Sequence, residues 1–207
     1  MSRLSRSMRA ASLAALCSAA LALSLPVSAQ RWGRVRTGAT FGNVFGGVTH
    51  VRGGEAFGPR GVAGRRSYTA TAADGSVVHQ GGRYAYGAHG GSYHAGNRYD
   101  RNPDGSAVAS RASYGRTANG GVYGSEGSYA RSADGSVSGS RQAGASGPRG
   151  DYYASSSTAG GVTTRNTTVT AANGHSYHGQ TTYTRGQGVT HSGGCADAGG
   201  NPVACGH

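Results

Sequence analysis

The chain has 207 residues, of which 39 are glycine, and a formal net charge of +12 from 20 basic and 8 acidic side chains. Every leucine and methionine lies within residues 1–25, and the chain has no isoleucine or lysine, so burial falls to valine, alanine and aromatic residues. That supply is too small for the core of a conventional enzyme domain, and the glycines raise the entropy cost of ordering the backbone. We therefore expect either a thin β-sheet or a substantially disordered chain.

Residues 1–29 have the pattern of a secretory signal peptide. Arginines at positions 3, 6 and 9 precede an apolar run over residues 10–25 that is too short to span a bilayer. Pro26 ends the run, and the small residues at 27–29 supply a cleavage site before Gln30. The sequence therefore predicts a secreted, periplasmic or cell-envelope protein after cleavage near Ala29.

The net charge stays strongly positive without this segment. Removing its three arginines leaves +9 (12 − 3) on residues 30–207. A basic exported protein is attracted to nucleic acid, acidic glycan or anionic lipid headgroups. The alternative is that the charge serves solubility alone.

The remaining chain divides into three parts. Residues 30–57 form a lead-in rich in glycine, valine and phenylalanine, without a clear period. A β-repeat region is expected over residues 58–192, regular to about residue 152 and degenerate after it. Residues 193–207 form a short tail that carries two cysteines.

A turn signal recurs at a fixed 15-residue step in the repeat region. Asp-Gly begins at 74, 104 and 134, and other residues precede glycine at 89, 119 and 149. Asp-Gly and Asn-Gly favour tight hairpin turns because both residues tolerate positive φ. The segments between the turns are rich in tyrosine, valine, serine and threonine and lack a helical period, so each predicts one long strand.

The expected fold is all-β, a Gly/Tyr-rich antiparallel β-meander of 15-residue strand-turn units that is partly disordered; a β-solenoid is the alternative. Residue types alternate between successive units, as at Val78, Tyr93, Val108 and Tyr123. The full period therefore covers two units, or two strands, and this 30-residue period favours the meander.

Symmetric pairing about the turns at 89–90 and 119–120 sets Tyr86 opposite Tyr93 and Arg116 opposite Tyr123. Because side chains alternate between the faces of a strand, one face is then rich in tyrosine and arginine. Such a face suits single-stranded nucleic acid or acidic carbohydrate, since rings stack and guanidinium groups bind phosphate or carboxylate. The predicted ligand-binding face comprises Tyr84, Tyr86, Tyr93, Tyr99, Arg101, Tyr114, Arg116, Tyr123, Tyr129 and Arg131.

Two alternatives accompany this face. The tyrosines could pack only on one another while the arginines solvate the sheet. A single sheet also needs a cover for the face, which could be another copy, residues 153–192 folded back over it, or a ligand.

The cysteines of the tail predict a disulfide. Cys195 and Cys205 are the only two outside the signal segment, and an exported chain favours their oxidation. A zinc site would add His191 and His207, but the close Cys-x-x-Cys pair of common zinc modules is missing. No metal or other cofactor is therefore predicted.

The sequence offers no acid/base pair or activated nucleophile for catalysis, which argues against a hydrolase. We expect an exported, non-enzymatic repeat protein that acts as a structural or adhesive component of the cell surface or extracellular space, through self-association. The alternative is a polyanion-binding protein that uses the Tyr/Arg face for nucleic acid, acidic glycan or lipid headgroups. No small-molecule substrate is expected.

Overall fold

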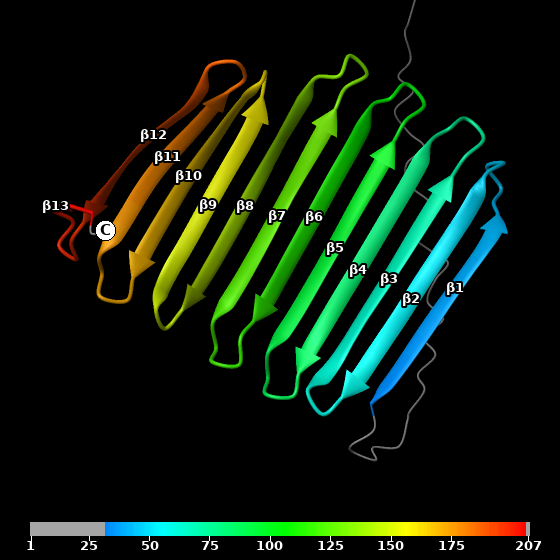
Figure 1. Cartoon of the computed structure of the whole chain (residues 1–207), viewed down its shortest axis with the longest axis horizontal. Coiled ribbons are helices and arrows are strands. Elements are labelled where there is room, and N and C mark those ends of the chain that lie inside the picture. The colour runs from blue at the N-terminus through cyan, green and yellow to red at the C-terminus, as the bar shows by residue number, and fades with distance from the viewer. Residues whose placement is uncertain (1–31, 206–207) are drawn as a thin grey trace, which may run out of the picture.

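A computed structural model describes residues 32–205 as one open β-sheet (Figure 1). Thirteen strands lie in the sheet in chain order, and each pairs antiparallel with the next. The predictions of an all-β chain and of antiparallel pairing are confirmed. The strands are β1 (Gly33–Gly42), β2 (Val48–Gly58), β3 (Gly61–Thr71), β4 (Val77–Gly87), β5 (Ser92–Arg101), β6 (Ala107–Arg116), β7 (Val122–Arg131), β8 (Val137–Gly147), β9 (Gly150–Ala159), β10 (Val162–Ala171), β11 (Ser176–Thr184), β12 (Gly188–Ala196) and β13 (Pro202–Val203).

Most connections between the strands are three-residue loops that end in a glycine with positive φ. In the loop between β4 and β5, the Gly87 amide donates to the Gly91 carbonyl at 2.7 Å, and the Gly90 amide donates to the Gly87 carbonyl at 3.1 Å. Gly90 has a φ of 89°, so the loop is a type I turn followed by a left-handed bulge residue. The same pair of hydrogen bonds closes the loops that end at Gly46, Gly75, Gly105, Gly120, Gly135, Gly174 and Gly200.

These loops place the strands one residue out of the register that symmetric pairing predicts. Ser92, not Tyr93, lies opposite Tyr86, and Val122, not Tyr123, lies opposite Arg116. The prediction was wrong because symmetric pairing requires the X-Gly pair to be a complete two-residue loop, whereas the pair fills the second and third positions of a three-residue loop. A slip of one residue moves side chains to the other face of the sheet.

Residues 32–205 form a single layer of strands (Figure 1), and large side chains on both faces of this layer are exposed to solvent. Ala154, at 6% exposure, is the only buried apolar side chain within residues 32–205. Large side chains such as Tyr114 and Val189 are 62% and 66% exposed. The described fold is therefore held by its hydrogen-bonded ladders and cross-strand side-chain pairs rather than by a packed core.

The two regions without a regular sequence period also form strands of this sheet. The lead-in contributes β1 and β2, and residues 153–192 contribute most of β9 to β12. These later strands extend the sheet beyond β8, so they do not fold back as a cover over the other strands. The predicted signal peptide at 1–29 lies outside the described residues.

The C-terminal edge of the sheet is tied by a disulfide. Cys195 on β12 is bonded to Cys205, which confirms the predicted pair. Between them, β13 pairs with only two residues of β12, Cys195 and Ala196. Within residues 32–205, none of the secondary structure is a helix long and apolar enough to cross a membrane.

Candidate functional site: an arginine-rich sheet face

The strand pairings sort the arginines onto one face of the sheet. Residues directly opposite one another share a face, so each side chain can be assigned by following the register from strand to strand. We call the face that carries Tyr93 the arginine face. Its ten strand arginines are Arg34, Arg36, Arg52, Arg65, Arg83, Arg101, Arg111, Arg131, Arg141 and Arg165.

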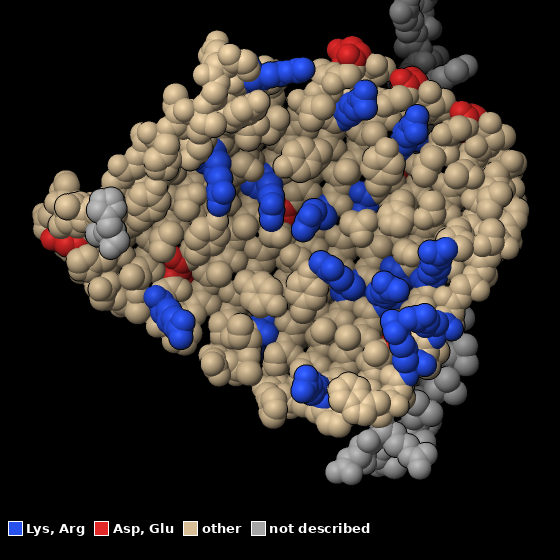
Figure 2. Space-filling view, in the orientation of Figure 1, with Lys and Arg blue, Asp and Glu red and all other residues tan. Residues whose placement is uncertain are grey.

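None of the eight acidic residues of the chain lies on the arginine face. Four lie on the opposite face, at Glu55, Asp100, Glu126 and Asp151, together with Arg66, Arg98 and Arg116. We call this the mixed face. The other four acids are in loops, at 74, 104, 134 and 197. Figure 2 shows blue side chains spread across the sheet and most red ones at its margin.

Arginines on the arginine face alternate with small residues from strand to strand. One row across β6 to β10 reads Arg111, Gly127, Arg141, Ser156 and Arg165. Arginines two strands apart are separated by about 9.5 Å, and only a small residue lies between them. An anion above Gly127 or Ser156 would therefore lie between two guanidinium groups, each able to donate paired hydrogen bonds.

A second pair of arginines repeats this arrangement nearer the turns. Arg101 on β5 and Arg131 on β7 flank Ala107 on β6. Tyr99 and Tyr129 lie two residues before these arginines, on the same strands and the same face. Each of the two arginines therefore has an exposed aromatic ring on its own strand. Tyr99 is 37% exposed and Tyr129 is 43% exposed.

Other tyrosines of the arginine face contact arginines directly. The Arg83 guanidinium carbon lies 5.3 Å from the Tyr93 ring centroid, and its Nη2 donates to the Tyr93 hydroxyl at 2.9 Å. Arg165 Nη2 donates to the Tyr152 hydroxyl at 3.0 Å. Tyr93 and Tyr123 stack with ring centroids 6.4 Å apart. These contacts orient the guanidinium groups without neutralising them.

The register divides the ten residues predicted to form one ligand-binding face. Tyr93, Tyr99, Arg101, Tyr123, Tyr129 and Arg131 lie on the arginine face, whereas Tyr84, Tyr86, Tyr114 and Arg116 lie on the mixed face. The prediction that all ten share one face was wrong, because the three-residue loops shift the strand register by one residue. The role of the residues in ligand binding stays a prediction.

Sequence reasoning missed eight of the ten strand arginines of this face, at 34, 36, 52, 65, 83, 111, 141 and 165. The sequence feature that could have identified their face is whether each residue number is odd or even. Within β4 to β8, opposed residues have numbers of equal parity, as in Tyr99 with Ala109 and Arg111 with Gly127. With the loop length known, the odd-numbered arginines of these strands could have been assigned to one face from the sequence alone.

The mixed face pairs its charges and clusters its rings. Arg98 Nε donates to an Asp100 carboxylate oxygen at 2.6 Å, and this hydrogen bond raises the pKa of Arg98. The Tyr84 hydroxyl donates to the Glu55 carboxylate, and this hydrogen bond raises the pKa of Tyr84. His94 stacks on Tyr114 at 4.8 Å and meets the edge of Tyr86 at 5.1 Å.

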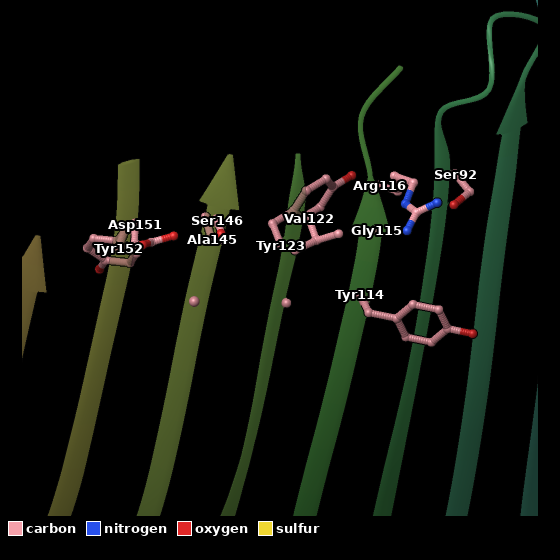
Figure 3. Close-up of a pocket in the computed structure, with 12 residues that line it drawn as sticks. Ser92, Tyr114, Gly115, Arg116, Val122, Tyr123, Ala145, Ser146, Asp151 and Tyr152 are labelled. Atoms are coloured by element: carbon pink, nitrogen blue, oxygen red, sulfur yellow. The ribbon is translucent and has the colours of Figure 1, made fainter. Parts of the chain in front are cut away.

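A hollow on the mixed face spans β5 to β9 (Figure 3). Arg116 lies at its β6 side next to Ser92, and Asp151 lies at its β9 side (Figure 3). Val122 on β7 lies between these charges, and Tyr114 lines the hollow on β6, two residues before Arg116. The hollow therefore has apolar walls with one cation and one anion at separate ends, unlike the uniform charge of the arginine face.

The loop aspartates form a third electrostatic element, at the rim of the sheet. The Ser76 hydroxyl and amide hydrogen-bond to the Asp74 carboxylate, and they lower its pKa. Asp104 and Asp134 have lowered pKa values from hydrogen bonds with Ser106 and Ser136 in the same places. These carboxylates are satisfied by their own loops, so they stabilise turns and leave the arginine face without a counter-charge.

Within residues 32–205, no three His, Cys, Asp or Glu side chains are grouped so that they could hold a metal ion. Cys195 and Cys205 are joined in the disulfide, so neither is available as a thiolate ligand. His191 instead contacts Thr181 Oγ1 at 2.9 Å and the Tyr177 hydroxyl at 3.0 Å. His207, the remaining residue of the zinc alternative, lies outside the described residues.

The chain matches no protein-family model, no curated protein and no solved structure. Its function is therefore inferred from the two faces of the sheet.

Proposed function

We propose that this protein is an exported, non-enzymatic binding protein that holds an anionic polymer on its arginine face. The observation that carries the proposal is the segregation of charge, with ten arginines and no acid on that face. A uniformly positive surface attracts a polymer of regularly spaced phosphates or carboxylates, and it does so more strongly than the net charge of the chain alone implies.

Binding would use the gaps between alternate arginines. Anionic groups lie above Gly127, Ser156 and Ala107, each between two guanidinium groups that donate forked hydrogen bonds. The exposed rings of Tyr99 and Tyr129 supply stacking surfaces for bases or sugar rings beside these positions. Release of the polymer's counterions supplies much of the free energy, so affinity falls as salt rises.

The test is binding of the purified chain to labelled single-stranded DNA and to an acidic polysaccharide, over a series of salt concentrations, with neutral dextran as the blank. Arg111→Gln with Arg141→Gln should weaken binding about 10- to 100-fold and lower the salt slope by about 2. The matched control, Arg98→Gln with Arg116→Gln, removes the same charge from the mixed face and should change affinity less than about threefold. Equal losses from both pairs would show attraction to net charge and would overturn the assignment to this face.

A tyrosine series separates stacking from charge. Tyr99→Ala with Tyr129→Ala should weaken binding at every salt concentration, because both rings lie beside the anion positions. Tyr84→Ala with Tyr114→Ala removes two rings from the mixed face and serves as the control. A preference for DNA over polysaccharide that vanishes with the first pair would identify bases as the stacked groups.

A structural or adhesive role is the second candidate, and the absence of a core within residues 32–205 favours it. Large apolar side chains are exposed on the sheet, and such exposed surfaces are typical of proteins that are covered by other molecules. In this role the protein would act at the cell surface or in the extracellular space after loss of residues 1–29. The sheet would be built from 15-residue strand-turn units in a 30-residue period, for which the positive-φ glycines at 75, 90, 105, 120, 135 and 150 are the support.

A further inference from the structure

The mixed face is the part of the sheet on which a second copy of the chain can pack. Association through the arginine face would set ten arginines against ten, without an acid between them. The mixed face carries three arginines and four acids, so its strand charges sum to −1 (3 − 4). Both signs are present, and residues of opposite charge can pair. Charge therefore permits two copies to meet through the mixed face.

The sheet edges are poorly suited to the same task. The outer strand β1 carries Arg34 and Arg36, and charged side chains on an edge strand hinder pairing with another chain. At the other edge, β13 covers the end of β12, contains Pro202 and is followed by the disulfide-bonded Cys205. Proline and very short edge strands have the same blocking effect. Face-to-face contact is therefore the open route to self-association.

One row of the mixed face is self-complementary. It reads Arg66, Gly82, Gly96, Ala112 and Glu126 across β3 to β7. Opposite charges stand at its two ends, each two strands from Gly96 on β5, with only small residues between them. Arg98 and Asp100 form the only salt bridge within residues 32–205, so Arg66 and Glu126 are not engaged in one there.

We propose that two copies form a homodimer through their mixed faces, about a two-fold axis that runs along β5. This axis places β3 of one copy over β7 of the other, so Arg66 of each copy meets Glu126 of its partner. Because the interface is isologous, the ion pair occurs twice.

The spacing of packed sheets fits this arrangement. Two sheets that pack face to face lie about 10 Å apart, with strand directions within about 30° of each other. The long side chains of Arg66 and Glu126 can meet across that gap at the ends of the row. The small residues at 82, 96 and 112 leave room at its centre, where a Cβ on Gly82 or Gly96 would lie 3.7 Å from the nearest heavy atom.

The rows on the side of the β4–β5 loop supply aromatic contacts, whereas the row on the other side holds Arg98, which the axis places opposite its own copy and whose charge Asp100 pairs. The same axis brings Arg116 on β6 over the partner's β4, next to the ring of Tyr86, which is 46% exposed. Tyr114 and Tyr84 are exchanged between the two copies in the same way. Burying these rings gives the dimer the hydrophobic layer that the single sheet lacks.

Charge exchange tests the proposal, with the dimer dissociation constant measured by analytical ultracentrifugation of the purified chain. Arg66→Glu and Glu126→Arg should each raise this constant at least about 10-fold, because each sets like charges together twice. The double variant, and an equimolar mixture of the two single variants, should return to within about threefold of the unchanged chain. Within one copy the two residues are four strands, about 19 Å, apart, so this rescue can arise only between copies.

The matched control is Arg65→Glu, which makes the same charge change at the adjacent residue on the arginine face. It should leave the dimer constant unchanged. Far-UV circular dichroism of every variant separates loss of dimer from loss of fold. A monomeric unchanged chain at tens of micromolar, or a double variant as weak as the singles, would overturn the proposed dimer.

Cross-linking supplies an independent measurement. Ser110 lies on the mixed face of β6 and Ser113 on its arginine face, so Ser110→Cys and Ser113→Cys place one thiol on each face. A bis-maleimide should join copies of the first variant and not of the second. The reverse pattern would place the contact on the arginine face and contradict the dimer. Because no anionic polymer is present, this result is independent of the proposed binding function.

Discussion

The arginine face and the mixed face use the same strands and the same glycine-rich backbone, and both carry tyrosines, but they differ in charge. The arginine face carries only cations on its strands, whereas the mixed face carries both signs and pairs Arg98 with Asp100. In a single layer, adjacent residues in sequence belong to different surfaces. Composition averaged along the chain therefore conceals the feature that defines each surface, and the function has to be sought one face at a time.

The comparison depends first on the turns, because they set which residues share a face. Gly150, the first residue of β9 after the turn from β8, has a φ of 124°, and a Cβ there would lie 2.0 Å from the Thr170 carbonyl oxygen. Gly150→Ala should lower the free energy of unfolding by about 3 kcal/mol or more, since backbone atoms of β10 would have to move.

Thermal or urea unfolding followed by circular dichroism measures this loss. The control is Gly90→Ala, where φ is also positive but the Cβ would have open space, and the expected cost is about 1–2 kcal/mol. Equal costs at both positions would mean that close approach of β10 does not hold this turn in place.

A smaller change in polymer affinity is expected when neighbouring serines on the two faces are each replaced by aspartate. Ser156 lies between Arg141 and Arg165 on the arginine face, and Ser155 lies on the mixed face. Ser156→Asp places a carboxylate in the proposed anion position and should weaken polymer binding about 10-fold. Ser155→Asp adds the same charge on the other side and should change the affinity by less than about twofold. Fluorescence anisotropy at low salt measures both, and similar losses would remove the distinction between the faces.

The smallest effect concerns the pH dependence of the mixed face. The hydrogen bond to Glu55 raises the pKa of Tyr84 above 10.0, so the neutral phenol is favoured in the folded chain. This contribution to stability is fully present below the unfolded pKa and is lost as pH rises through the folded pKa of Tyr84. Unfolding midpoints measured from neutral pH to strongly alkaline pH should fall less steeply in Tyr84→Phe. An identical alkaline profile in both proteins would show that this hydrogen bond adds nothing.

Much of the fold could be predicted from the sequence. The glycines of the 15-residue turn signal mark the loops, and the segments between them are single strands, as their residue types indicate. The register could not be predicted from the Asp-Gly and related pairs alone, because such a pair fits either a two-residue or a three-residue loop. Hydrogen bonds such as that from the Gly90 amide to the Gly87 carbonyl decide between them.

The candidate site inherits that ambiguity. Tyr84, Tyr99, Tyr114 and Tyr129 keep one 15-residue spacing, yet they alternate between the mixed face and the arginine face. Tyrosine spacing therefore predicted a repeated surface but could not predict which surface. The strand arginines were the better guide, since Arg101 with Arg131 and Arg111 with Arg141 lie two strands apart in the chain and share a face.

The three-residue loops restrict how such a chain can change in length during evolution. Among β4 to β7, where each strand with its loop spans 15 residues, duplication of one such unit would exchange the two faces for every strand that follows, because 15 is an odd number. Duplication of two successive units would lengthen the sheet and preserve both surfaces. Descendants that lengthen this part of the sheet and keep both chemistries should therefore differ from this chain by even numbers of strands.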